Sequence, residues 1–107
     1  MVVDDHNHAD YCGHGLEAMI EDMDRNNIDV TWLLTCEIPL NDWEHKSANS
    51  SFGFTGEAQM PLERAVRYKD KYPDRFVLGY CPNPSDPFAI DKLDAAVNTY
   101  GVQVCGE

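Results

Sequence analysis

Short apolar runs alternate with amphipathic stretches along the chain, and this alternation predicts its secondary structure. The first apolar run, residues 2–8, is expected to form a strand. One face of a helix follows, with apolar side chains at i, i+3, i+4 and i+7: Leu16, Met19, Ile20 and Met23. Asn26 and Asn27 would end that helix. Residues 28–36 are rich in β-branched and aromatic residues without strict alternation, which is typical of a strand buried on both faces.

The second half of the chain repeats this pattern. Pro61 can begin a helix, whose inner face would comprise Leu62, Ala65 and Val66. Residues 75–81 are expected to form a third strand, and residues 83–87 a turn with a helix N-cap and a first-turn proline. The apolar positions of the next helix fall on one face: Ile90, Leu93, Val97 and Tyr100. Gly101 is suited to end that helix, and residues 102–105 would begin a fourth strand.

The predicted order is therefore β-α-β-α-β-α-β, an α/β arrangement with parallel strands and right-handed crossovers. The N-terminal half of a TIM-like (β/α)8 barrel and a small doubly wound sheet share this local pattern, and periodicity alone does not separate them. A complete (β/α)8 barrel takes about 250 residues, whereas this chain has 107. A single domain covering residues 1–107 is expected.

Composition and charge narrow the classes of function. Hydrophobic residues make up 43% of the chain, which is typical of a globular protein. The formal net charge of −11 argues against nucleic acid and anionic membranes as partners. No apolar run is long enough to span a membrane and no signal peptide is recognisable, so we expect a cytoplasmic protein. The expected partner is a small-molecule substrate. The four cysteines form no C-x-x-C pair and are expected to be free, mostly buried thiols.

The best candidate for chemistry is a pair of histidines at the end of the first predicted strand. His6 and His8 are two residues apart, so their side chains would share one face of the strand, with Cα atoms roughly 6.6 Å apart. Two imidazoles at that spacing can converge on one metal ion. Asp4 would lie on the same face and orient a ligand or a water molecule. The alternative is a polar strand end that binds no metal.

Other candidate site residues lie after later strands or in loops. Glu107 follows the fourth predicted strand, at the edge expected to hold His6 and His8; taken alone, an exposed terminal acid is the favoured interpretation. Residues 38–56 lack a regular period and read as a long loop that covers this edge, or as a plain surface loop. The candidates for substrate contact are His14, Trp43, His45 and Phe52. No nucleophile elbow, phosphate-binding loop or dinucleotide fingerprint is present, so metal chemistry is favoured.

The segment from Asp4 to His8 resembles the D-x-H-x-H opening of the amidohydrolase superfamily. The resemblance is closer to the amidohydrolase-related group, which includes metal-dependent decarboxylases. Three further passages resemble that group: MDRNNID at residues 23–29, YPDRF at 72–76, and the helix at 93–101. Each motif is moderately specific, but their order and spacing together are distinctive. The resemblance covers nearly the whole chain, and residues 38–56 match least.

This resemblance implies a TIM-like barrel with one or two divalent metals, zinc first and manganese or another ion second. It implies His6 and His8 as ligands and Glu107 in the place of a fourth-strand ligand. The later histidines of the family and its catalytic aspartate have no counterpart here, so an N-terminal fragment is expected. The implied activity is hydrolysis of an amide, ester or lactone, with decarboxylation second. Two alternatives stay open, a non-catalytic fragment and a flavodoxin-like binding domain without metal.

Overall fold

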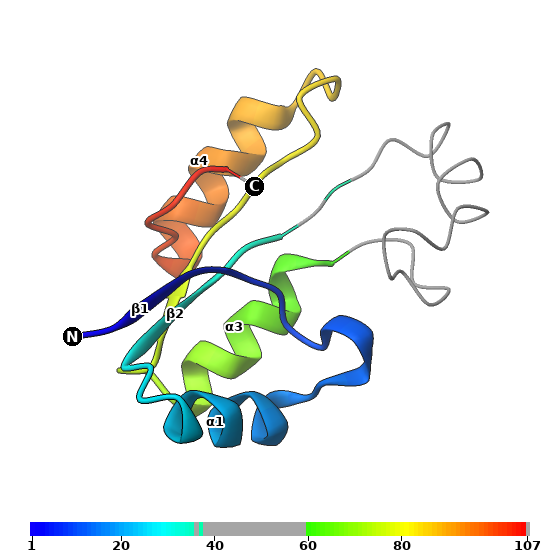
Figure 1. Ribbon diagram of the computed structural model, residues 1–107. Helices are drawn as coiled ribbons and strands as arrows, with labels where there is room; N and C mark the ends of the chain where they lie inside the picture. Colours follow the sequence, from blue (N-terminus) through cyan, green and yellow to red (C-terminus); the bar gives the residue numbers. More distant parts are fainter. Residues whose placement is uncertain (36, 38–59, 107) are drawn as a thin grey trace.

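The computed structural model describes residues 1–35, 37 and 60–106, and its elements alternate between strand and helix (Figure 1). In chain order they are β1 (Val3–Asn7), the 3-10 turn η1 (Tyr11–Gly13), α1 (Leu16–Arg25), β2 (Val30–Leu33), α3 (Leu62–Lys71), β3 (Phe76–Leu78) and α4 (Ala89–Tyr100). The predicted alternation of strands and helices is confirmed over these residues. The strands are shorter than the apolar runs that predicted them.

The three strands form one parallel sheet in the order β1-β2-β3. Thr31 of β2 lies between Asp4 of β1 and Phe76 of β3, which fixes the register of all three strands. Parallel strands bring their carboxyl ends to the same edge of a sheet. Over the described residues the structure is thus a small α/β unit with three strands and three α-helices, compatible with part of a TIM-like barrel.

The predicted fourth strand is reduced to a single point of pairing. Val104 forms an isolated parallel bridge with Gly79, just after β3, and its carbonyl accepts from the Tyr80 amide at 2.9 Å. The Gln103 amide donates to the carbonyl of Leu78 at 2.9 Å. This segment therefore lies where a fourth parallel strand would begin, beside β3.

The core lies between the sheet and the helices. Figure 1 shows α1 and α3 side by side, and side-chain contacts from Lys71 and Tyr72 to Glu17 join them. As predicted, α1 buries Met19 and Met23. The buried side chains of α3 are Leu62, Ala65 and Tyr68, and those of the sheet include Leu33, Phe76 and Leu78. The inner face of α1 and two positions of α3, Leu62 and Ala65, were therefore predictable from the 3.6-residue period. On α3, Val66 is only partly buried, and the buried Tyr68 was not predicted.

The apolar face predicted for α4 is only partly buried. Ala96 is buried and Leu93 packs partly against the core. Ile90, by contrast, is 71% exposed, and Val97 and Tyr100 are also exposed. A residue pattern gives the apolar side of a helix, but burial needs a neighbour to cover that side. Within the described residues only the middle of α4 packs against the core.

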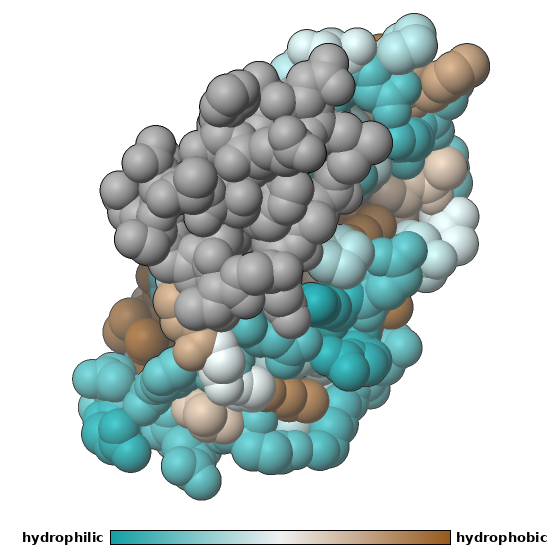
Figure 2. Space-filling model, turned by 90° about the vertical axis from the view of Figure 1, so that its right-hand side faces the viewer, coloured by the Kyte–Doolittle hydropathy of each residue, from teal (hydrophilic) through white to brown (hydrophobic). Residues whose placement is uncertain are grey.

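The surface is largely polar, as the net charge of −11 predicts. Figure 2 shows one face of the molecule, on which most of the coloured surface is hydrophilic and the apolar patches are small. The expectation of mostly buried thiols is wrong for the described cysteines. Cys12, which lies in the turn η1, and Cys105 are exposed, and Cys81 is half-buried. No helix among the described residues is both long and apolar enough to cross a membrane.

Candidate metal half-site

The carboxyl end of β1 is bulged, which changes how its side chains are presented. Asp4 pairs with Thr31 and Asn7 with Leu33, so three steps along β1 correspond to two along β2. Both carboxylate oxygens of Asp4 accept hydrogen bonds inside this bulge. The His6 amide donates to one oxygen at 3.3 Å, and the Asn7 side-chain amide donates to the other at 2.9 Å. The bulge interrupts the regular strand geometry from which a shared face for Asp4, His6 and His8 was predicted, and Asp4 supports the backbone that carries His6.

His6 and His8 nevertheless approach each other. Their ring centroids are 5.2 Å apart, with the ring planes at 86°. The Nδ1–H of His8 donates to the carbonyl oxygen of Leu34 at 3.0 Å, just past the end of β2. Because a carbonyl can only accept, this contact requires a proton on Nδ1. In the neutral ring, the lone pair is then on Nε2. Metal-binding histidines are commonly oriented in this way, by a backbone carbonyl on the other ring nitrogen.

A cavity of about 330 Å³ lies beside His8, between β1 and α1. Its polar wall includes Asn7, His8 and Tyr11, and its apolar wall includes Met19 and Met23. The Tyr11 ring lies 5.6 Å from the His8 ring.

His14, a predicted substrate contact, also lines this cavity. Its Nδ1 is 4.0 Å from a carboxylate oxygen of Asp22. The structure therefore brings His14 to the same cavity as His8, which the sequence pattern did not specify.

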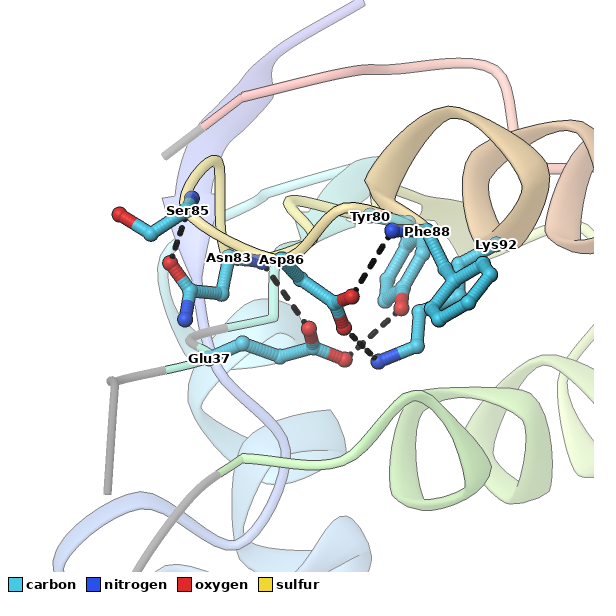
Figure 3. Close-up of polar contacts among 7 residues, drawn as sticks. All are labelled: Glu37, Tyr80, Asn83, Ser85, Asp86, Phe88 and Lys92. Carbon is cyan, nitrogen blue, oxygen red and sulfur yellow. Dashed lines mark hydrogen bonds and ion pairs between the residues drawn. The ribbon is translucent and has the colours of Figure 1, made fainter.

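A second polar cluster lies at the carboxyl ends of β2 and β3 (Figure 3). One carboxylate oxygen of Glu37 accepts from the Tyr80 hydroxyl at 2.7 Å, and the other accepts from the Asn83 amide at 3.0 Å. Burial and the Glu37 carboxylate raise the pKa of Tyr80, so its hydroxyl stays protonated. Nearby, Lys92 donates to Asp86 at 2.5 Å. Sequence reasoning missed Glu37 and Tyr80, because 43 residues separate them.

The turn after β1 is held by α3. The Tyr68 hydroxyl donates to one carboxylate oxygen of Asp10 at 2.7 Å and accepts from the Asp10 backbone amide at 3.1 Å. Arg67 donates to the other carboxylate oxygen at 2.8 Å. The Arg64 guanidinium lies 4.0 Å from that same oxygen. Sequence reasoning missed these residues as well, since nothing local to the β1 motif points to a helix more than 50 residues later.

The predicted metal ligands and substrate contacts lie only partly within the described residues. Glu107, Trp43, His45 and Phe52 lie outside them. Among residues 1–35, 37 and 60–106, no group of three or more His, Cys, Asp or Glu side chains is arranged to hold a metal. Two imidazoles, one with its tautomer set by Leu34, fit half of the donor set of a divalent metal. We therefore describe His6 and His8 as a half-site, and the metal centre itself stays a prediction.

Comparison with known proteins finds a resemblance in three dimensions. No family model matches the sequence, and no curated protein matches it. Among solved structures, the chain is similar to 4-oxalomesaconate hydratase, LigJ, from Rhodopseudomonas palustris, with a TM-score of 0.59 and 16% sequence identity. The match covers 98% of this chain and 40% of the LigJ chain. The shared feature is the fold. This α/β unit therefore has the fold of part of the LigJ chain.

Proposed function

We propose that this chain supplies the two-histidine half of a divalent metal centre in a hydrolase of the amidohydrolase type. The observation that carries the proposal is the approach of the His6 and His8 rings to 5.2 Å, with the His8 Nδ1–H bound to Leu34. The fold likeness to LigJ supports it, and so does the D-x-H-x-H order at the end of β1. The chain spans less than half of the LigJ chain, so activity of the whole enzyme is part of the proposal.

Each residue has a defined task in this proposal. His6 and His8 would hold the ion, His8 through Nε2, and Asp4 holds the bulged backbone between Asp4 and Asn7. Glu107 is proposed as a third ligand. Zinc is the first choice of ion and manganese the second. When bound, such an ion polarises a carbonyl and lowers the pKa of water towards neutrality, which suits attack on an amide, ester or lactone.

Substrate contacts are proposed for the side chains around this edge. His14 shares a cavity with His8, which favours it for contact with a small-molecule substrate. Trp43, His45 and Phe52 are proposed for the same role from their position in the sequence.

A second candidate is lyase chemistry, because the fold neighbour is named a hydratase. If the lyase reaction is a decarboxylation, the same histidines would hold an ion that binds the substrate carboxylate. A zinc-loaded chain tested on a panel of amides, esters, lactones and unsaturated carboxylic acids separates the two reactions. Zinc binding without turnover of any of these would instead favour a non-catalytic fragment that needs a partner.

The half-site is tested by zinc titration calorimetry on the full chain and on His6→Ala and His8→Ala. We expect each substitution to weaken zinc binding by at least about 100-fold, which is more than the loss typical of outer-sphere changes. His14→Ala is the matched control and should bind zinc as the wild type does, because His14 is not proposed as a ligand. Unchanged zinc binding in both the His6 and His8 variants would refute the half-site.

A further inference from the structure

The turn that follows the histidines is held by the buried Tyr68, in addition to the contact from Arg67 on the surface. Asp10, two residues after His8, has the left-handed backbone angles φ 60° and ψ 22°. This conformation is unfavourable for most residues and is tolerated best by glycine, asparagine and aspartate. The Tyr68 hydroxyl bonds both the backbone amide and the carboxylate of Asp10. Two bonds to one residue fix its backbone as well as its side chain, so Tyr68 selects this conformation.

Tyr68 is itself held rigidly. It is 1% exposed, and its ring lies 5.6 Å from the ring of Phe76 in β3. Burial is the main cause of the raised pKa of Tyr68, and the bond to Asp10 adds to it. The hydroxyl therefore stays protonated at neutral pH, as its donor role requires. Tyr68 thus connects the Asp10 turn to α3, on which it lies, and to Phe76 of β3.

The backbone of this turn determines the positions of the two residues nearest His8 in the segment, Ala9 and Tyr11. Ala9 is buried, and Tyr11, directly after Asp10, places its ring 5.6 Å from the His8 ring. A change in the Asp10 backbone would move both neighbours of this segment, and with them the wall against which the imidazole rests. The bond from His8 Nδ1–H to Leu34 depends on the ring keeping its place.

We propose that Tyr68, acting through Asp10, is a positioning residue that holds the His8 imidazole in the orientation in which its Nδ1–H donates to Leu34. The consequence for metal binding rests on the proposed function. The part that concerns the orientation and tautomer of His8 holds for the metal-free chain. Leu34 also helps to orient His8, because its carbonyl accepts the hydrogen bond from Nδ1–H.

The test is Tyr68→Phe, which removes the hydroxyl and keeps the ring against Phe76. The tautomer of His8 is read from the nitrogen-15 shifts of its ring in the metal-free chain, and zinc affinity is measured separately. We expect the His8 ring to change from one Nδ1–H form to a mixture of tautomers. Zinc affinity should fall by about 10-fold, the lower end of the loss seen when the support of a metal ligand is removed.

Tyr72→Phe is the matched control. Tyr72 follows α3, and its hydroxyl donates to the exposed Glu17 of α1 at 3.3 Å. This variant should keep the wild-type His8 signature. A second pair of variants guards against a failure of Tyr68→Phe to fold. Asp10→Asn keeps an acceptor and the tolerance for positive φ, so it should retain the His8 signature, whereas Asp10→Ala should lose it.

A wild-type tautomer signature for His8 in folded Tyr68→Phe would overturn the proposal, and so would a wild-type signature in Asp10→Ala. If the wild-type chain binds no zinc but Tyr68→Phe still alters the His8 ring, the proposed metal function fails and the positioning role is supported. If zinc binding depends on His6 and His8 but not on Tyr68 or Asp10, the half-site survives and the positioning role is refuted.

Discussion

The two polar clusters at the carboxyl edge of the sheet are built in opposite ways. The histidine cluster is largely local in sequence, because Asp4 supports His6 and Asn7 across two or three residues, while Leu34, just past β2, adds a contact from a distant segment. The Glu37 cluster, which consists of Glu37, Tyr80 and Asn83, joins distant segments, since Tyr80 and Asn83 follow Glu37 by more than 40 residues. Local construction leaves a motif that can be read in the sequence, whereas long-range construction leaves none. The comparison also separates two tasks, presenting ligands to a metal and tying strand ends together.

The largest expected effect is on metal binding at the histidine cluster. His8→Ala should weaken zinc binding by at least about 100-fold, about 2.7 kcal/mol, while Glu37→Gln should leave it within about twofold. Calorimetric titration of both variants sharpens the comparison between the clusters. A larger loss in Glu37→Gln than in His8→Ala would show that the ligand-presenting cluster has been assigned to the wrong strand ends.

The next largest effect is expected at the contact between β2 and the end of β3. A Cβ at Gly79 would clash with the Leu34 side chain, and Leu34 also provides the acceptor for His8. Gly79→Ala should therefore lower the free energy of unfolding by about 1–3 kcal/mol, as overpacking does elsewhere. Urea denaturation measures this. Gly15→Ala, where the nearest atom to a new Cβ lies 4.0 Å away, should cost less. Equal stability of the two variants would contradict the close packing at Gly79.

A smaller effect is expected from the tie between strand ends. Tyr80→Phe removes the hydroxyl that donates to Glu37, so the free energy of unfolding should fall by about 1–2 kcal/mol, with zinc affinity unchanged. Tyr100→Phe is the control, because that side chain is 46% exposed, and it should change stability by less than about 0.5 kcal/mol. A loss of zinc affinity in Tyr80→Phe would break the separation between the two clusters.

The smallest effect is expected at Asp86, beside the Glu37 cluster. The bond from Lys92, then the bond from the Phe88 amide, lower the pKa of Asp86 below its ordinary value. A lowered folded pKa means that the carboxylate stabilises the fold fully above that ordinary value and loses this effect as the pH falls through the lowered pKa. Lys92→Met should therefore flatten the acid end of the stability profile slightly. Identical profiles between pH 2 and 5, in the range about the ordinary aspartate pKa of roughly 3.9, would show that this pair contributes nothing.

Much of the fold was accessible from the sequence because it rests on periodicity. The inner faces of α1 and α3 follow the 3.6-residue repeat, and β2 lies within an apolar run. The outcome at α4 differs, because a repeat cannot tell whether a neighbour is present to cover Ile90. The fourth strand was expected in full, but the described residues show an isolated bridge at Val104 and backbone bonds from Gln103 and Val104 to Leu78.

The candidate site was accessible only where its residues are close in sequence. His6 and His8 were identified from their spacing, although the bulge that shapes their backbone depends on the register with β2. The hold of Tyr68 on Asp10 spans 58 residues and joins a helix to a turn, so it required the tertiary structure. The same holds for Leu34, whose backbone carbonyl carries no side-chain signal at all.

The central claim is that His6 and His8 together bind a divalent metal. X-ray absorption on the zinc-loaded chain tests it directly, because imidazole ligands give nitrogen scattering at about 2.0–2.1 Å together with the outer-shell pattern of the ring. We predict two imidazole ligands per zinc in the wild type and one in either His6→Ala or His8→Ala. A zinc site with only oxygen ligands, or with the same imidazole number in all three proteins, would contradict the claim.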